Sequence, residues 1–247
     1  MTLNFTKMQG AGNDYIYIDA LREESPVRNI TNDELSKLAI RLSSRHFGVG
    51  ADGLVLILPS SVANARMRIF NADGSEAEMC GNATRCIGLY LHRYHYPTAE
   101  ELSLETRDGI KYIHIEDDGL ITVYMGQEIG NPHAVNFVDQ ITDDMVLVDG
   151  PRIEHDPKYP NRTNVEFVQV LDRHSVRMRV WERGSGETLA CGTGACAVAQ
   201  EAIRQGLCES PISVHLPGGD LTIAIHEDGR IFMTGPAEIV FSGQIEI

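Results

Sequence analysis

The sequence predicts an α+β protein of two pseudo-symmetric halves, each a curled, mostly antiparallel sheet around one central helix. Residues 66–82, RMRIFNADGSEAEMCGN, align without a gap with residues 177–193, RMRVWERGSGETLACGT, at an offset of 111. Residues 113–123, IHIEDDGLITV, align with 223–233, IAIHEDGRIFM, at an offset of 110. Matches at nearly one offset indicate an internal duplication. Two such halves place an active site in the cleft between them.

The duplication divides the chain into two expected domains, residues 1–126 and residues 127–247, with a linker near 126–132. A chain of 247 residues is long enough for two compact domains. Its 43% of hydrophobic residues is enough to build two cores.

Three helices are expected. Thr31 and Glu34 have the spacing of a capping box, and the apolar residues that follow recur at helical intervals, which predicts a helix over 32–45. Residues 82–95 and 193–205 are apolar on nearly every face, a pattern typical of a buried helix. These last two helices occupy matching places in the repeat.

The remaining regular segments are expected to be short strands, because apolar and polar residues alternate along them. Asp118-Gly119 and Asp228-Gly229 are strong signals for hairpin turns. The expected strands are 15–19, 54–58, 66–70, 102–106, 111–116, 121–125, 134–138, 165–171, 176–181, 212–216, 221–226 and 230–234.

Composition favours a cytoplasmic protein with a small-molecule ligand. The formal net charge of −14 argues against nucleic acid, which requires a basic surface. No apolar run approaches the roughly 18 residues of a membrane span, and residues 1–5 lack the features of a signal peptide. Five cysteines, an odd number, suit a reducing compartment better than a disulfide framework. None is arranged as CxxC, so no metal site is expected.

Two of the five cysteines are the expected catalytic pair. Cys80 and Cys191 align in the repeat, and each stands at the start of a predicted helix. Backbone N–H groups and the helix dipole stabilise a thiolate there, so such thiols can titrate below the free pKa of about 8.5. Cys86 and Cys196 lie inside the helices and are expected to be small core residues, and Cys208 is expected to be structural.

The same helix starts predict the ligand. Gly81, Asn82, Gly192 and Thr193 follow the two cysteines, and their backbone N–H groups suit an anion such as a carboxylate. A carboxylate there would hold an α-carbon between two sulfurs, with one thiolate as base and one thiol as acid. The chain has no GxGxxG before a helix, no P-loop and no lysine motif suited to pyridoxal phosphate, so we expect chemistry without a cofactor.

Six segments carry a resemblance to a known family: KMQGAGNDY (7–15), FGVGADGL (47–54), NADGSEAEMCGN (71–82), GNPHAV (130–135), RTNVEFVQV (162–170) and WERGSGETLACGTGA (181–195). On these segments the chain resembles the diaminopimelate epimerases, within the group of two-cysteine amino-acid racemases and epimerases. The resemblance implies interconversion of LL- and meso-diaminopimelate, a step toward lysine and peptidoglycan, by a cytoplasmic homodimer. It also suggests that a final strand at about 238–247 returns to the first domain.

The resemblance assigns roles residue by residue. Cys80 and Cys191 match the catalytic pair. Arg183 would bind the carboxylate of the non-reacting head of the substrate, and Glu182 would pair with the ammonium of that head. The matching positions for substrate binding are Asn13, Asn71, Gly81, Asn82, Asn131, Asn164, Glu182, Arg183, Gly192 and Thr193.

The chain departs from the family pattern at two places. Ala83 follows the first Cys-Gly-Asn, where family members commonly carry glycine, and the stretch 126–130 is shorter than usual before the GNPH motif. His133 of that motif is expected to orient or pack rather than act as a base. Glu76 and Glu187 match across the repeat and are expected to brace the cysteine loops.

Three other functions remain as alternatives. The first is a racemase of the same fold that acts on another amino acid, such as histidine. The second is a binding protein without catalysis, and the third is a redox-sensing dithiol protein. A panel of substrates separates the first from the epimerase, and exchange of the α-proton with deuterated water separates the second.

Overall fold

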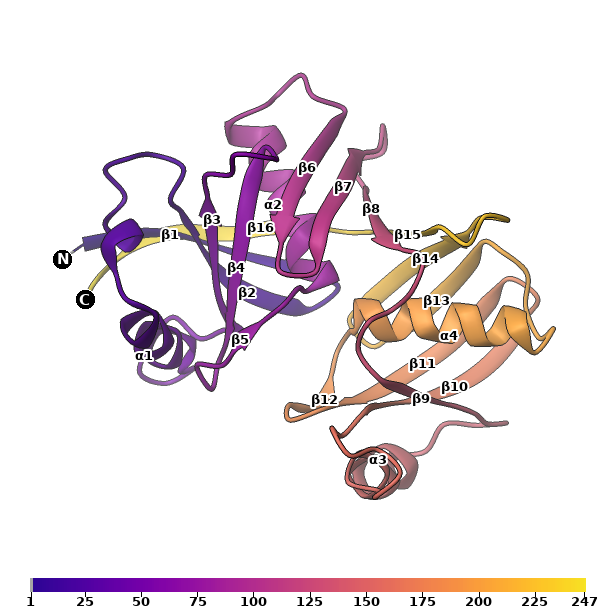
Figure 1. Ribbon diagram of the computed structural model, residues 1–247. Helices are drawn as coiled ribbons and strands as arrows, with labels where there is room; N and C mark the ends of the chain where they lie inside the picture. The colour runs from indigo at the N-terminus through magenta and orange to yellow at the C-terminus, as the bar shows by residue number, and fades with distance from the viewer. Residues whose placement is uncertain (1) are drawn as a thin grey trace. The chain divides into compact units, whose positions relative to one another are not determined.

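The computed structural model describes residues 2–247 and divides the chain into two compact units (Figure 1). Unit 1 contains the chain up to Gly10, then Asp14–Val123 and Ala237–Ile247. Unit 2 contains Ala11–Asn13 and Tyr124–Pro236. Each unit is a sheet with helices packed against it, which confirms the predicted α+β class.

The sheet of unit 1 is mixed and mainly antiparallel. Its strand order is β16-β1-β2-β3-β4-β6-β7-β8, and a short strand β5 pairs with β4. The β2–β3 and β4–β6 pairs are parallel, whereas β1–β16, β3–β4, β6–β7 and β7–β8 are antiparallel. The bounds are β1 (Thr2–Gly10), β2 (Asn13–Asp19), β3 (Gly53–Leu58), β4 (Ala65–Asn71), β5 (Glu76–Ala77), β6 (Glu101–Thr106), β7 (Gly109–Ile115), β8 (Ile121–Gly126) and β16 (Glu238–Glu246).

Three helical elements complete unit 1: η1 (Pro26–Asn29), α1 (Asn32–Ser43) and α2 (Gly81–Tyr94). The predicted capping box is present, because Glu34 N–H donates to the Thr31 hydroxyl and the Glu34 carboxylate accepts from the Thr31 N–H. The apolar face of α1 packs into a core with Ile16, Leu54 and Phe70. Helix α2 is buried over most of its length, as its composition predicts.

Unit 2 has the same plan, with strand order β15-β14-β13-β11-β10-β9 and a short β12 beside β11. Helix α4 (Gly192–Arg204) packs against this sheet (Figure 1). The β9–β10 and β11–β13 pairs are parallel and the others antiparallel. The other bounds are β9 (His133–Phe137), η2 (Met145–Asp149), α3 (Gly150–Glu154), β10 (Asn164–Asp172), β11 (Ser175–Glu182), β12 (Gly186–Thr188), β13 (Ile212–Leu216), β14 (Gly219–Ile225) and β15 (Ile231–Gly235).

The sequence repeat is also a structural repeat. The order β4-β5-α2-β6-β7-β8 in unit 1 corresponds to β11-β12-α4-β13-β14-β15 in unit 2. Phe70 pairs with Glu76 across β4 and β5, and the equivalent Trp181 pairs with Glu187 across β11 and β12. Each glutamate also forms an ion pair at 2.7 Å, with Arg68 in unit 1 and with the matching arginine in unit 2. The two glutamates therefore brace the hairpins that lead to the cysteines.

Within residues 2–247, five parts of the fold were not among the expected elements: β1, η1, β5, the segment η2–α3 and β12. Strand β1 was not expected, and it buries Lys7, whose ammonium group lies 2.6 Å from the Asp14 carboxylate. The helical segment η2–α3 was not expected either, since Gly150-Pro151 favours a turn in an isolated chain. In the fold this segment packs against Trp181, so closely that a Cβ on Gly150 would lie only 2.9 Å from the Trp181 Cβ.

None of the helices formed by residues 2–247 has the length and apolar character that crossing a bilayer requires.

Candidate active site

In unit 1, Cys80 is the N-cap residue of α2, and the loop between β4 and β5 precedes it. Its backbone is extended, with φ −137° and ψ 121°, and the residue is partly buried. The loop is closed by Asn71, whose backbone N–H donates to the Ser75 carbonyl at 2.8 Å and whose side-chain amide donates to the Ser75 hydroxyl at 3.0 Å. The loop therefore presents Cys80 at a helix N-terminus, as predicted.

The first turn of α2 is almost completely buried. Gly81, Asn82 and Ala83 are all buried, and Arg85 has no exposed surface. Arg85 donates a hydrogen bond from its guanidinium to the Asn82 side-chain oxygen at 2.8 Å. The Asn82 side-chain oxygen is thus engaged inside unit 1.

Asp52 connects two loops that carry predicted substrate-binding asparagines. The Asp14 N–H, next to Asn13, donates to Asp52 Oδ2 at 3.1 Å. The Ala72 N–H, next to Asn71, donates to the Asp52 backbone carbonyl at 2.9 Å. The aspartate of the FGVGADGL motif therefore has a structural role, because its hydrogen bonds link the backbones of the two loops that carry Asn13 and Asn71.

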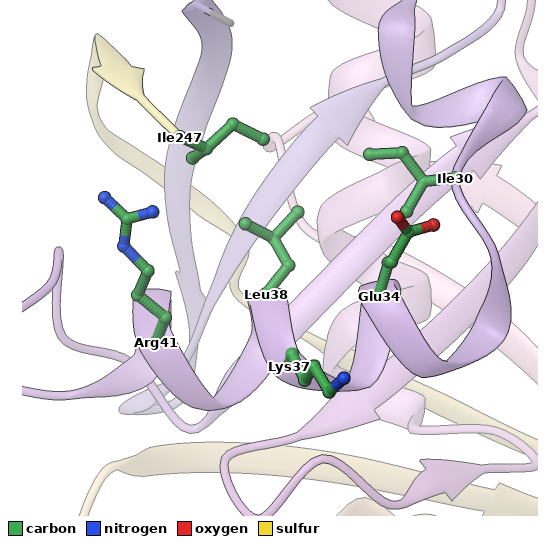
Figure 2. A pocket seen from close by; sticks show the side chains of 6 residues that line it. All are labelled: Ile30, Glu34, Lys37, Leu38, Arg41 and Ile247. Carbon is green, nitrogen blue, oxygen red and sulfur yellow. The ribbon is translucent and has the colours of Figure 1, made fainter.

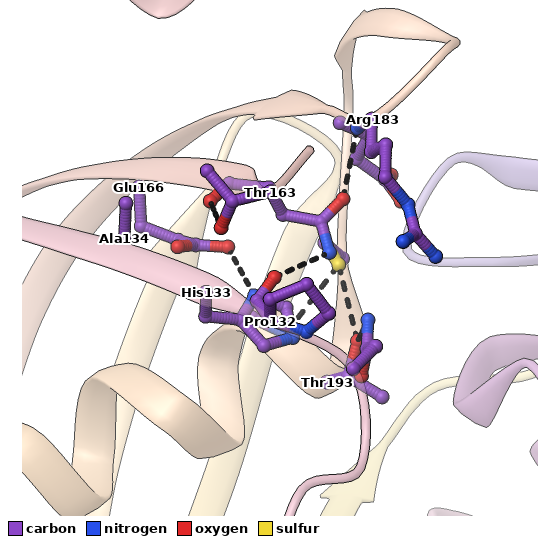
Figure 3. A network of polar contacts seen from close by, with 12 residues as sticks. Pro132, His133, Ala134, Thr163, Glu166, Arg183 and Thr193 are labelled. Atoms are coloured by element: carbon purple, nitrogen blue, oxygen red, sulfur yellow. Dashed lines mark hydrogen bonds and ion pairs between the residues drawn. The ribbon is translucent and has the colours of Figure 1, made fainter. Parts of the chain in front are cut away.

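In unit 2, Cys191 is the N-cap residue of α4 and is 5% exposed. Its sulfur accepts the Gly194 backbone N–H at 3.4 Å and lies 3.5 Å from the Thr193 hydroxyl oxygen. The Thr193 hydroxyl in turn accepts from the Asn131 side-chain amide at 3.3 Å. A predicted catalytic thiol and two predicted binding residues thus share one chain of contacts (Figure 3).

Asn164 extends this network to the β11–β12 turn. Its side-chain oxygen accepts the Arg183 backbone N–H at 2.9 Å, and its amide donates to the Pro132 carbonyl at 3.3 Å (Figure 3). Glu182 accepts a hydrogen bond from the Thr188 hydroxyl. The network of unit 2 therefore brings together a large share of the predicted site: Asn131, Asn164, Glu182, Arg183, Cys191, Gly192 and Thr193. Asn71, Cys80, Gly81 and Asn82 belong to unit 1, and Asn13 belongs to the short segment 11–13 of unit 2.

The pKa of the Cys191 thiol is raised, whereas a helix N-terminus alone would lower it. Burial raises the pKa of the Cys191 thiol well above its ordinary value, and the nearby Glu182 and Glu166 carboxylates raise it further. The hydrogen bonds from Thr193 and Gly194 lower the pKa but are outweighed. Burial also raises the pKa of Glu182 and of Glu166. Burial and the two carboxylates therefore favour the thiol form of Cys191, and a positive charge brought near it would favour the thiolate.

A buried His133–Glu166 pair lies beneath the start of α4, and Glu166 was not predicted. His133 Nδ1 and Glu166 Oε1 are 2.6 Å apart, with side chains 4% and 0% exposed (Figure 3). Within residues 2–247, His133 Nε2 and Glu166 Oε2 have no hydrogen-bond partner. A Cβ on Gly194 would come within 2.8 Å of Glu166 Oε1, so the pair abuts the turn that holds Cys191. A glutamate within the apolar run NVEFV is the signal that could have revealed it.

A cavity of about 360 Å³ lies on unit 1 beside α1 and contains none of the predicted site residues (Figure 2). Its apolar wall is formed by Ile30, Leu38 and Ile247, and its charged rim by Glu34, Lys37 and Arg41.

The fold matches solved structures of several enzyme families, including the following two. A PhzF-family phenazine biosynthesis protein from Enterococcus faecalis superposes with a TM-score of 0.74 and 14% identity, covering 100% of both chains. A hydroxyproline epimerase from Agrobacterium vitis superposes with a TM-score of 0.67 and 15% identity, covering 99% of this chain and 91% of the other. At these identities the likeness defines the fold: the two-domain, duplicated fold shared by PhzF-type proteins and epimerases.

Sequence comparison defines the family. The profile of the family described as diaminopimelate epimerase matches residues 5–129 and 127–240, once for each half. A diaminopimelate epimerase of Methanococcus maripaludis is 43% identical over 99% of this chain and 100% of its own. One of Bacteroides thetaiotaomicron is 45% identical over 99% of this chain and 98% of its own. The chain belongs to the diaminopimelate epimerase family.

The chain is shorter than these relatives. The alignment with the M. maripaludis protein extends over 284 positions, so at least 37 of them have no counterpart among the 247 residues here.

Proposed function

We propose that the protein is a diaminopimelate epimerase that interconverts LL- and meso-2,6-diaminopimelate by proton transfer at one α-carbon, without a cofactor. The observation that carries the proposal is the single network of unit 2. It holds a thiol at a helix N-terminus together with the Asn164 and Arg183 groups suited to a second amino-acid head. Full-length identity of 43% to a diaminopimelate epimerase supports the same substrate.

The chemistry requires two groups on opposite faces of one carbon. One cysteine, as thiolate, removes the α-proton, and the other, as thiol, donates its proton to the opposite face, which inverts the configuration. After turnover the two sulfurs have exchanged protonation states, so the reverse reaction uses the same groups in opposite roles. The N–H groups at the starts of α2 and α4 would hold the reacting carboxylate and stabilise the charge that develops as the proton leaves.

The electrostatics of Cys191 suit activation by the substrate. Burial raises the pKa of the Cys191 thiol, and the Glu182 carboxylate raises it further. A substrate ammonium group beside Glu182 would neutralise that carboxylate and supply positive charge, so the pKa of Cys191 would fall when the substrate binds. The thiolate would then form only in the complex, where it is needed as the base.

Specificity for diaminopimelate would come from the non-reacting head. The Arg183 guanidinium can form a bidentate pair with its carboxylate, and the amide of Asn164 can donate or accept hydrogen bonds. A racemase for histidine or another amino acid with one head would have no use for this arrangement. The family relationship likewise favours the epimerase over that alternative.

The cellular setting follows from the proposed reaction. The product serves the biosynthesis of lysine and of peptidoglycan precursors, which is cytoplasmic chemistry. We propose that the protein acts there as a homodimer and does not bind nucleic acid. Light scattering coupled to size-exclusion chromatography tests the assembly, and a monomer with full activity would contradict the proposed dimer.

Proton exchange in deuterated water under reducing conditions tests the proposed function. LL-diaminopimelate is compared with histidine, glutamate, lysine and proline by mass spectrometry and NMR. We expect deuterium to enter diaminopimelate alone, with the meso isomer appearing. Exchange into another amino acid would support the two-cysteine chemistry but would assign a different substrate to the protein. Absence of exchange into all of them, with the thiols confirmed reduced, would support the non-catalytic alternative.

Full activity after quantitative formation of a Cys80–Cys191 disulfide would contradict the two-base mechanism.

A further inference from the structure

Glu154 is a buried carboxylate with no part in the proton transfer described above. It is the last residue of α3 and is 3% exposed. Burying a carboxylate is costly unless hydrogen-bond donors or cations surround it. The donors that surround the Glu154 carboxylate therefore indicate which part of the structure it stabilises.

Both oxygens of Glu154 accept hydrogen bonds from the β11–β12 hairpin. Oε2 accepts the Trp181 indole N–H at 2.8 Å, and Oε1 accepts the Gly184 backbone N–H at 3.0 Å. The Arg162 guanidinium lies 3.5 Å from Oε1 and is half exposed. The two hairpin donors lie two residues before and one residue after Arg183, so the carboxylate spans the residue proposed to bind the substrate.

Arg183 and Gly184 are the central residues of a tight turn, which the Ser185 N–H closes by donating to the Glu182 carbonyl at 3.1 Å. Gly184 has φ +78°, a conformation that favours glycine. The two central N–H groups have different acceptors: Asn164 for Arg183 at 2.9 Å, and Glu154 for Gly184 at 3.0 Å. The turn is therefore held by two side chains from different elements.

Helix α3 is itself fixed in place. Gly150 packs against Trp181, and Ile153 and Trp181 pack on a core that includes Val165 and Phe167. The Arg183 guanidinium donates to the Asn161 carbonyl at 3.0 Å, in the loop that follows α3. The segment from α3 to that loop thus contacts both the backbone turn and the side chain of Arg183.

We propose that Glu154 is a positioning residue that sets specificity by holding the Arg183 turn where the guanidinium meets the non-reacting carboxylate of diaminopimelate. The inference rests on the proposed function, because that function assigns Arg183 to this carboxylate. Glu154 acts on binding of the distal head, which is bound in the ground state and in the transition state alike. Its loss should therefore raise KM and leave kcat nearly unchanged.

A double-mutant cycle on the full-length protein tests this with Glu154→Gln, Arg183→Met and the combined variant. In the otherwise wild-type protein, which keeps Arg183, we expect Glu154→Gln to raise KM for LL-diaminopimelate by about 10- to 100-fold. This is the usual effect of losing a buried hydrogen bond to a charged group. In the Arg183→Met background we expect the same change to alter kcat/KM by less than about twofold, because its target is gone.

Glu209→Gln is the matched control, because Glu209 is an exposed unit 2 glutamate paired with Arg173, and it should leave KM unchanged. Equal losses in both backgrounds, or a fall in kcat with KM constant, would overturn the proposal and identify Glu154 as a general structural residue. If circular dichroism shows that Glu154→Gln is unfolded, Glu154→Asp keeps the charge with a shorter reach and must show the same rise in KM. Wild-type protein that does not epimerise diaminopimelate would refute the proposed function instead, whatever the variants do.

Discussion

Glu166 and Gly194 occupy adjoining space beneath the N-terminus of α4: a Cβ on Gly194 would lie 2.8 Å from Glu166 Oε1 and 3.0 Å from Met178 Cε. The N–H of the same glycine donates to the Cys191 thiol. Position 194 therefore lies against a buried carboxylate and also caps a thiol, and a larger residue there requires the ends of the Glu166 and Met178 side chains to move. The matching position in unit 1 is Ala83, which is buried in the first turn of α2.

Gly194→Ala should destabilise the protein by up to about 2 kcal/mol, because overpacking a core costs about 1–3 kcal/mol and the better helix propensity of alanine offsets about 1 kcal/mol. It should also reduce activity, because displacing Glu166 or the helix turn moves Cys191. Urea denaturation and the rate of deuterium exchange measure the two effects. Ala83→Gly is the matched change in unit 1 and should cost only about 1 kcal/mol, through helix propensity. A Gly194→Ala protein more stable than wild type by about 1 kcal/mol would show that this crowding is relieved without cost.

Cys80→Ala and Cys191→Ala should each lower epimerisation by at least about 10²- to 10⁴-fold, the usual contribution of a general acid or base. Both directions need both groups, so neither variant should retain one direction alone. Cys→Ser at either position should leave at most a trace, because an alkoxide is a far costlier base than a thiolate. Chiral chromatography of the isomers measures the rates, and Cys208→Ala is the control. Either Ala variant with near wild-type turnover would contradict the two-base mechanism.

Glu182→Gln should lower the pKa of the Cys191 thiol, because the Glu182 carboxylate raises it in the wild-type protein. The pH dependence of iodoacetamide alkylation, followed by mass spectrometry of the Cys191 peptide, reports this pKa. Glu166→Gln should act in the same direction, since Glu166 also raises the pKa. Glu209→Gln should leave the profile where it is. An alkylation profile that moves to higher pH in Glu182→Gln would show that this carboxylate does not govern the thiol.

Cys86 should make the protein less stable at high pH. Burial raises its pKa from an ordinary 9.0 to about 11 in the folded state. The folded state therefore binds this proton more tightly, and the stabilisation is complete below pH 9 and lost as pH rises toward 11. The loss amounts to about 3 kcal/mol at most, from two units of pKa. Urea denaturation from pH 8 to pH 11 should show a shallower decline for Cys86→Ala than for wild type, and parallel declines would exclude Cys86 as the source.

Local sequence signals predicted much of the fold. The capping box at Thr31 and Glu34, the alternation along the strands and the buried character of α2 depend on neighbours within a few residues, so the sequence alone reveals them. The duplication was equally visible, and the structure repeats it down to the pairing of Phe70 with Glu76 and of Trp181 with Glu187. Strand β1 and α3 were missed because their partners are distant in sequence: β1 pairs with β16, and Gly150 of α3 packs against Trp181.

The sequence by itself determined that two thiols stand at two equivalent helix starts, and it identified the family through motifs spread over both halves. Tertiary structure alone decided the surroundings of those thiols. Burial raises the pKa of the Cys191 thiol, and so does the charge of Glu166, which lies in strand β10 of the sheet. Both oppose the effect of the helix N-terminus. Glu154 reaches the Arg183 turn only through the packing of α3. Periodicity and spacing record local geometry, whereas desolvation and long-range hydrogen bonds depend on which segments the fold brings together.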